Sequence, residues 1–142
     1  MEASPQPARI SLRRRIEWMD TDAAGIYHWT TAFRLAEAAE AALHSALGFA
    51  DRTFGATPRV RVQAEFKRAL RFNDAVDVTL AVTAMGRTSV RYDLTIAHDG
   101  ALAVEGEIVS CFVDRATGRA IPWPDDIRAP LLSAGAQRPA DF

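Results

Sequence analysis

The segment that decides the fold reads DTDAAGIYHW over residues 20–29. It follows a strand-like run and leads into an alanine-rich helical pattern. A carboxylate can attack a carbonyl carbon or activate a water molecule, and the free N–H groups at a helix start can hold an oxyanion. The segment offers two carboxylates, a turn glycine and a helix start within a short distance. It therefore predicts an acyl-transfer site.

The hydrophobic period changes on either side of this segment. Residues 9–19 alternate apolar and polar side chains, which is typical of a half-buried strand. Residues 31–47 repeat apolar side chains at i, i+3, i+4 and i+7, which indicates a helix with one buried face. Thr30 or Thr31 is expected to cap the helix start, and Gly48 its end. Four further strand-like runs follow, at residues 59–67, 75–84, 89–97 and 101–114.

This order of elements predicts an α+β fold, in which one long helix packs against a five-stranded antiparallel sheet. Asp99-Gly100 predicts a tight hairpin turn. The 142 residues suit a single domain over 1–142, with a core at about 9–125 and loose ends at 1–8 and 133–142. One helix is too few to protect both edges of such a sheet, so we expect dimerisation.

Composition excludes several functional classes. The net charge of −1 gives no electrostatic basis for binding nucleic acid. No apolar run approaches the roughly 18 residues of a membrane span. The single cysteine, Cys111, excludes an internal disulfide and fits a reducing, cytoplasmic setting. No spacing of cysteine and histidine predicts a metal site.

Residues 15–26 read RIEWMDTDAAGI and are followed by an aromatic pair and the helical pattern. This stretch resembles the 4-hydroxybenzoyl-CoA thioesterase family of hotdog-fold proteins, and the Tol-Pal-associated acyl-CoA thioesterases carry the same Asp-Thr-Asp-Ala-x-Gly motif. The element order matches over residues 9–125. The motif match covers residues 15–29 and, more weakly, 86–89. The resemblance implies a hotdog fold, in which a curved sheet wraps the long helix, and a dimer or dimer of dimers.

The resemblance also implies hydrolysis of an acyl thioester carried on CoA or on an acyl carrier protein. Asp22 matches the catalytic carboxylate of the family, either as nucleophile or as general base. In the ungapped alignment, the backbone N–H of Trp29 matches the donor that polarises the thioester carbonyl. Relatives often carry tyrosine or histidine there, and a shift of one residue would give that position to His28. No cofactor is implied beyond the CoA or phosphopantetheine of the substrate.

Further residues are placed at the substrate by the same resemblance. Arg87, Thr88 and Ser89 start a strand where relatives contact the pantetheine or its phosphates, and arginine suits phosphate. Glu37 occupies a helix position where Tol-Pal-associated relatives carry a glutamate. A solvated surface is the alternative for all four residues. The predicted substrate-binding set is completed by Gly25, Tyr27 and Thr30.

Several residues also have a purely structural interpretation. Asp22 could be a turn or cap residue, and Asp20 is expected to accept hydrogen bonds from turn amides. His44 and His98 are expected at the surface, and Cys111 is expected to be an inert buried thiol. The candidate walls of an acyl pocket, each of which could equally be core, are Trp18, Phe33, Phe54 and Phe66.

The sequence leaves three other functions open. A hotdog dehydratase or hydratase pairs an aspartate with a histidine, but at a different spacing from that of Asp22 and His28. A non-hydrolytic protein of the same fold would bind an acyl thioester or shape a polyketide product. An interaction protein would use the dimer only to scaffold partners. Loss of thioester turnover with intact dimerisation would favour the interaction protein.

Overall fold

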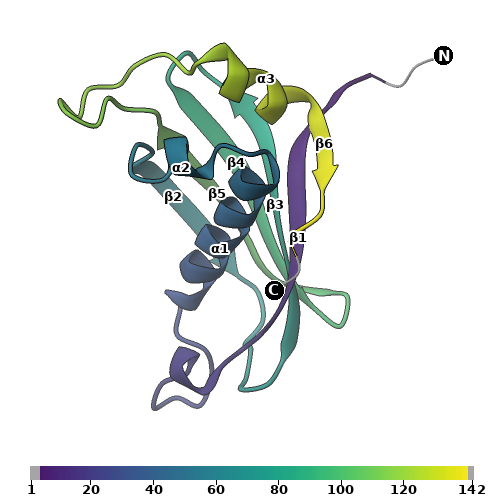
Figure 1. Ribbon diagram of the computed structural model, residues 1–142. Coiled ribbons are helices and arrows are strands. Elements are labelled where there is room, and N and C mark those ends of the chain that lie inside the picture. Colours follow the sequence, from purple (N-terminus) through teal and green to yellow (C-terminus); the bar gives the residue numbers. More distant parts are fainter. Residues whose placement is uncertain (1–3, 141–142) are drawn as a thin grey trace.

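The computed structural model describes residues 4–140, which form one long helix held against a single curved sheet (Figure 1). The strands are β1 (Gln6–Arg15), β2 (Arg59–Phe66), β3 (Ala75–Met85), β4 (Ser89–His98), β5 (Ala101–Cys111) and β6 (Ala134–Gln137). The helical elements are the 3-10 turn η1 (Trp18–Asp20), the long α1 (Thr31–Ala46), the short α2 (Ala50–Thr53) and α3 (Asp125–Ser133).

The sheet has the strand order β2-β5-β4-β3-β1-β6. Neighbours among β1 to β5 are antiparallel, which confirms the predicted α+β fold with one long helix on a five-stranded antiparallel sheet. A sixth strand was not predicted, because β6 lies in the tail that was expected to be loose. β6 pairs in parallel with β1, where Arg9 lies opposite Ala136. Its four residues are too few and too small to show an alternating pattern.

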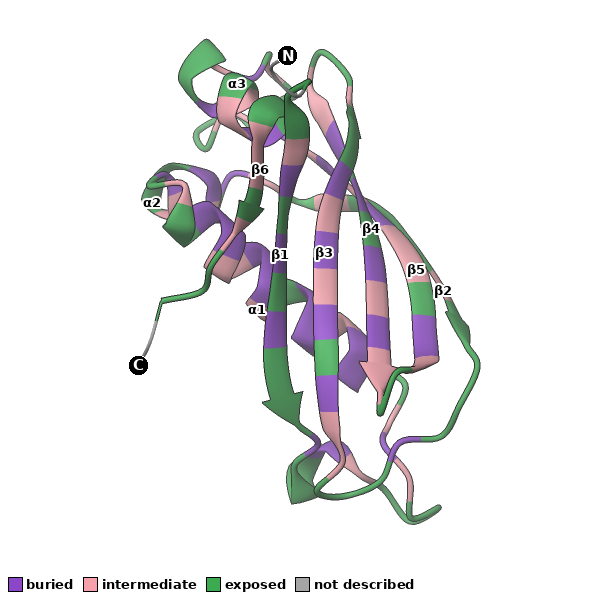
Figure 2. Ribbon diagram, turned by 90° about the vertical axis from the view of Figure 1, so that its right-hand side faces the viewer, coloured by how far each residue is buried: buried purple, intermediate pink, exposed green. Residues whose placement is uncertain are grey.

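The core lies between α1 and the concave face of the sheet. α1 turns Leu35, Ala39 and Leu43 toward the strands, and its many alanines allow the helix to approach them closely. Along β3, buried and more exposed residues alternate, as the period of a half-buried strand requires (Figure 2). The Asp99-Gly100 turn has positive φ at both residues, which confirms the predicted tight hairpin.

The two edges of the sheet are protected unequally. The first half of β1 is covered by β6, whereas β2 is a free edge that contains no buried residue. Val62 and Phe66 of β2 are 42% and 46% exposed, although their cross-strand partners Ile108 and Val104 are buried in the core.

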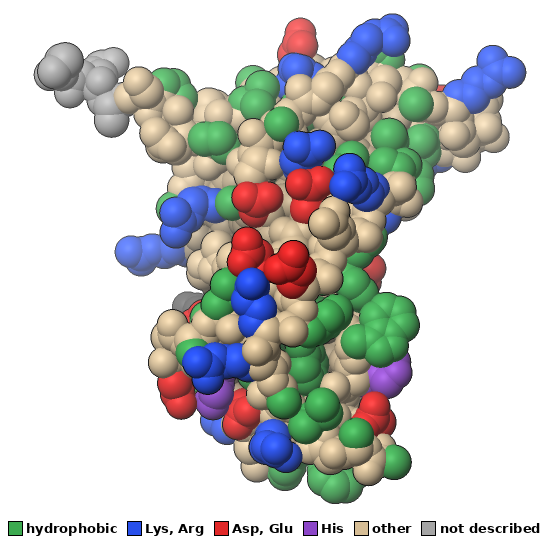
Figure 3. All heavy atoms as spheres, turned by 180° about the vertical axis from the view of Figure 1, so that it is seen from behind, with side chains coloured by type: hydrophobic (Ala, Val, Ile, Leu, Met, Phe, Trp, Pro, Cys, Tyr) green, Lys and Arg blue, Asp and Glu red, His purple; other side chains and the backbone are tan. Residues whose placement is uncertain are grey.

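On the face seen from behind, acidic and basic side chains lie among one another, and no large patch carries a single sign of charge (Figure 3).

Two local predictions are corrected by the fold. The first strand ends at Arg15, and Trp18 is an exposed residue of η1 that meets Phe72 edge-on at 5.4 Å. His44 is buried instead of lying at the surface, because α2 and the sheet cover its side of α1.

None of the helices within residues 4–140 has the length and apolar character that crossing a membrane requires.

Candidate active site

The turn that carries Asp22 is built by local sequence. Asp22 Oδ1 accepts the N–H of Ala24 at 2.8 Å, and the Asp22 carbonyl oxygen accepts the N–H of Gly25 at 3.0 Å. Gly25 has a φ of +79°, a left-handed conformation that glycine adopts without strain. An isolated bridge between Thr21 and Tyr27 closes the turn. The turn therefore holds the Asp22 carboxylate at an exposed position.

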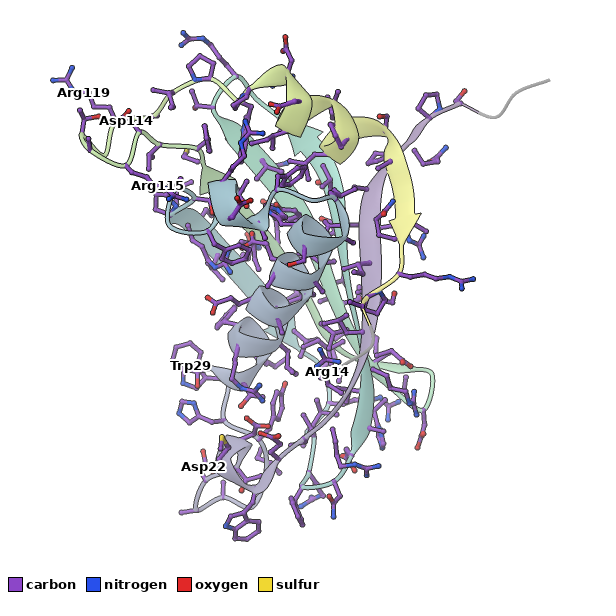
Figure 4. The ribbon with its side chains drawn as sticks, viewed as in Figure 1. Arg14, Asp22, Trp29, Asp114, Arg115 and Arg119 are labelled. Carbon is purple, nitrogen blue, oxygen red and sulfur yellow. The ribbon has the colours of Figure 1, made fainter. Side chains whose placement is uncertain are left out.

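A hollow of about 310 Å³ collects several of the predicted residues near the start of α1. Asp22, His28 and Thr30 line it together. Figure 4 shows Asp22 and Trp29 at the same end of the molecule. The other lining residues, which sequence analysis did not assign to the substrate or to catalysis, are Met19, Asp20, Thr21, Thr31 and Arg34.

The backbone N–H of Trp29 makes no hydrogen bond within the described residues. The N–H groups of both neighbouring residues are hydrogen-bonded. The His28 N–H donates to the Asp20 carbonyl, and the Thr30 N–H donates to the His28 ring. Trp29 lies two residues before the start of α1, at the positive end of the helix dipole. An unpaired donor at this place is what a developing oxyanion requires.

His28 lies in the hollow and takes part in capping α1. Its Nδ1 accepts the N–H of Thr30 at 3.3 Å and lies 2.7 Å from the Thr30 hydroxyl. Because an N–H can only donate, this contact assigns Nδ1 as the accepting nitrogen, so that neutral His28 carries its proton on Nε2. Thr30 holds the N-cap position, as predicted, but its hydroxyl makes no capping hydrogen bond, and its own N–H donates to the His28 ring.

Asp20 has the structural role that the sequence predicted. It is 4% exposed, and its Oδ2 accepts the N–H of Glu17 at 2.8 Å. Its Oδ1 accepts a bond from Arg34 Nη2 on α1 at 2.7 Å. The carboxylate thus joins the turn before Asp22 to the first turns of α1.

Tyr27 lies behind the turn, with its ring 6.4 Å from that of Phe66 on β2. The ring is buried, and burial raises the pKa of the Tyr27 hydroxyl. That hydroxyl has no hydrogen-bond partner among the described residues. Tyr27 does not line the hollow, so its predicted contact with substrate stays a prediction.

The remaining predicted residues lie elsewhere in the chain. Glu37 is exposed on α1, with Oε2 at 3.8 Å from Arg59 Nη2. Arg87, Thr88 and Ser89 precede or begin β4 beside the end of β5, the end of the sheet where Asp114 lies (Figure 4). Asp22 lies at the opposite end of the molecule. A single chain therefore does not bring this segment to the hollow.

Arg34 is the residue of the hollow that sequence analysis missed most clearly. In the sequence, its position one turn into the helix, on the same side as Thr30 and Thr31, indicated that it could lie near the site. An arginine that only faces solvent gives the same pattern, so the sequence did not decide between the two roles.

No group of three or more His, Cys, Asp and Glu residues in the part of the chain that the structure describes is arranged to hold a metal ion.

The chain matches the model of the thioesterase-like superfamily over residues 16–131, which include the Asp22 turn, α1 and strands β2 to β5. The chain belongs to this superfamily. Among curated proteins, this thioesterase-like chain is 25% identical over 127 residues to the 1,4-dihydroxy-2-naphthoyl-CoA hydrolase of Synechococcus elongatus, covering 85% of the chain and 93% of the hydrolase.

Solved structures show the same fold. A predicted thioesterase from Bacillus stearothermophilus superimposes with a TM-score of 0.79 at 23% identity, over 87% of this chain and 93% of that one. A thioesterase from Thermus thermophilus, complexed with coenzyme A and Zn, superimposes with a TM-score of 0.78 at 21% identity, over 85% and 90% of the two chains. The hotdog fold expected for a thioesterase-like chain is thereby confirmed.

Proposed function

We propose that this chain hydrolyses an acyl-CoA thioester, with Asp22 as the catalytic carboxylate and the Trp29 N–H as the oxyanion donor. The observation that carries the proposal is the pairing of these two groups at one end of the molecule: an exposed carboxylate on a tight turn, and an unpaired backbone donor at the start of α1. Membership of the thioesterase-like superfamily and the likeness to a curated CoA-ester hydrolase support the same reaction.

Two routes fit this arrangement. In the first, Asp22 attacks the thioester carbonyl and the thiolate leaves, which gives a mixed anhydride that water then hydrolyses. In the second, Asp22 takes a proton from water, and the resulting hydroxide attacks the carbonyl. In both routes negative charge develops on the carbonyl oxygen, where the Trp29 N–H and the helix dipole would stabilise it.

The carboxylate, the amide and water account for every bond made and broken. We therefore propose no cofactor apart from the CoA, or the phosphopantetheine of a carrier protein, within the substrate. His28 would donate a hydrogen bond from Nε2 to a substrate oxygen, because its Nδ1 is occupied by Thr30. A CoA substrate and one unpaired cysteine suit a cytoplasmic enzyme.

A homodimer, or a dimer of dimers, completes the proposal. The free edge of β2 and its half-exposed apolar inner face suit a second copy of the chain, because β6 already covers part of the other edge. Antiparallel pairing of two β2 strands would bring the two ends of the sheet together across the two-fold axis. The partner subunit's Arg87, Thr88 and Ser89 would then approach the Asp22 end, where they would contact pantetheine or phosphates.

The test is hydrolysis of a panel of aromatic, short-chain and long-chain acyl-CoAs, followed by release of free thiol. Asp22→Asn should lower turnover at least about a hundredfold, which corresponds to about 2.7 kcal/mol of barrier. Asp93→Asn, on an exposed face of β4, is the matched control and should keep wild-type turnover. A single turnover in H₂¹⁸O separates the routes, since only the nucleophilic one can leave label in Asp22.

Three outcomes would count against the proposal. Turnover unaffected by Asp22→Asn would move the site away from this turn. Turnover only with acyl carrier proteins would keep the site and change the carrier. Binding of acyl-CoA without turnover would favour a non-hydrolytic protein of the same fold.

A further inference from the structure

Asp20 connects the two segments that carry the proposed catalytic groups. Its side chain is fixed at both oxygens, by the Glu17 N–H at 2.8 Å and by Arg34 Nη2 at 2.7 Å. Its carbonyl oxygen accepts the N–H of His28 at 2.6 Å and the hydroxyl of Thr31 at 3.3 Å. One buried residue therefore binds η1, the residue before Trp29 and the first turns of α1.

Asp20 lies close in the chain to both proposed catalytic groups, so its contacts affect how they are placed. Asp22 follows two residues later, and Trp29 directly follows His28, whose N–H bonds to the Asp20 carbonyl. Asp20 is thus one of the residues that join the turn carrying the Asp22 carboxylate to the segment carrying the Trp29 N–H. Within the described residues, Arg34 is the cation in salt-bridge contact with Asp20.

We propose that the Asp20–Arg34 ion pair is a positioning device, which holds the Asp22 carboxylate and the Trp29 N–H at the separation that thioester hydrolysis needs. The inference rests on the proposed function. Asp20 is 4% exposed, whereas the Arg34 side chain is 48% exposed. Loss of Arg34 would leave a buried carboxylate without its cation, and the turn would shift to give that carboxylate solvent. Such a shift would separate the two catalytic groups.

Arg34 also lines the hollow beside Asp22, so a direct contact with substrate is the competing role. The two roles predict different kinetics. A residue that only positions the catalytic groups lowers kcat and leaves KM nearly unchanged, whereas a residue that holds the bound substrate raises KM. A displacement of about 1 Å costs up to about a hundredfold in rate, which sets the scale of the expected loss.

The experiment compares Arg34→Gln, Arg34→Lys and Asp20→Asn with wild type, using the best acyl-CoA of the panel well below the thermal midpoint of each variant. Arg34→Gln should lower kcat about ten- to a hundredfold with KM within about twofold. Arg34→Lys should recover part of this loss, because it keeps the charge. The matched control is Arg13→Gln, which breaks an exposed Arg–Asp pair between β1 and β3 and should leave kcat unchanged.

A double-mutant comparison separates positioning from general destabilisation. If Arg34 acts by placing Asp22, adding Arg34→Gln to Asp22→Asn should lower the residual rate much less than it lowers the wild-type rate. The inference would be overturned if Arg34→Gln kept the wild-type kcat, whether or not its KM rose. If Asp22→Asn were inactive in the same experiment, the proposed function would still stand. Full turnover by Asp22→Asn would overturn both.

Discussion

The Nε2 atom of His44 lies 2.7 Å from the hydroxyl oxygen of Tyr92, in the interior between α1 and β4. The other ring nitrogen, Nδ1, lies 2.6 Å from the hydroxyl oxygen of Thr53 on α2. All three residues are buried. The histidine is therefore fully hydrogen-bonded in a place where a charged imidazolium would lose its hydration.

This environment makes the free energy of unfolding depend on pH. Burial, and to a smaller extent the charge of Arg59, lowers the pKa of His44 from 6.5 to about 4. Above pH 6.5 the imidazole is neutral in both states. Between pH 6.5 and 4 the unfolded chain binds a proton that the folded chain does not, so the free energy of unfolding falls as the pH falls. The full loss is on the order of 3 kcal/mol.

Urea denaturation at pH 7, 6 and 5 measures this dependence. His44→Gln should be less stable than wild type at pH 7, and should lose less stability between pH 7 and 5. His98→Gln is the control, because a hydrogen bond to the Ala75 carbonyl raises the pKa of half-buried His98 and so acts in the opposite direction. An unchanged acid dependence in His44→Gln would contradict the assignment.

Removal of a single hydroxyl should have different effects at two buried tyrosines. Tyr92→Phe leaves His44 Nε2 without its partner, and should cost about 1–2 kcal/mol of the free energy of unfolding. Tyr27→Phe removes a hydroxyl that has no partner among the described residues, and should be neutral or stabilising. Urea denaturation at pH 7 compares the two variants directly. Equal losses would argue against the described hydrogen bonding.

Gly106 is predicted to be intolerant of a side chain. A Cβ at this position of β5 would lie 2.5 Å from the carbonyl oxygen of Gln63 on β2, and backbone cannot move aside cheaply. Gly106→Ala should therefore cost about 1–3 kcal/mol and loosen β2 from β5. In Gly86→Ala the new Cβ meets chiefly the movable hydroxyl of Ser89, so this variant is the control and should cost less. Thermal denaturation measures the difference.

The free edge of β2 predicts the effect of a charge on assembly. Val62→Glu places a carboxylate on the apolar inner face that the proposed dimer would cover, and should shift the chain from dimer to monomer. Gln63→Glu puts the same charge on the other face of the strand, and should leave the dimer intact. Light scattering after size exclusion gives the mass of each variant. A wild-type chain that is monomeric at micromolar concentration would refute the proposed dimer.

The sequence determined the features that depend on neighbours along the chain. The helical period of residues 31–47 became α1 (Thr31–Ala46), and the four strand-like runs became β2 to β5. In α1, β3 and β4 the side-chain period matches the backbone conformation that buries one face. The hairpin at Asp99-Gly100 and the turn at Asp22 were equally local, since both depend on left-handed glycine and short hydrogen bonds.

Only the tertiary structure decided which distant residues meet. β6 forms because β1 offers an open edge, a fact that its own four residues do not contain. His44 is buried because α2 and β4 pack on its side of α1, which the helical period alone does not specify. Arg34 reaches Asp20 because η1 packs beside the first turns of α1. Arg87 precedes β4 next to the last residues of β5, at the end of the sheet opposite to Asp22. Local propensity chooses each element, but burial and pairing between elements choose the neighbours that make a site.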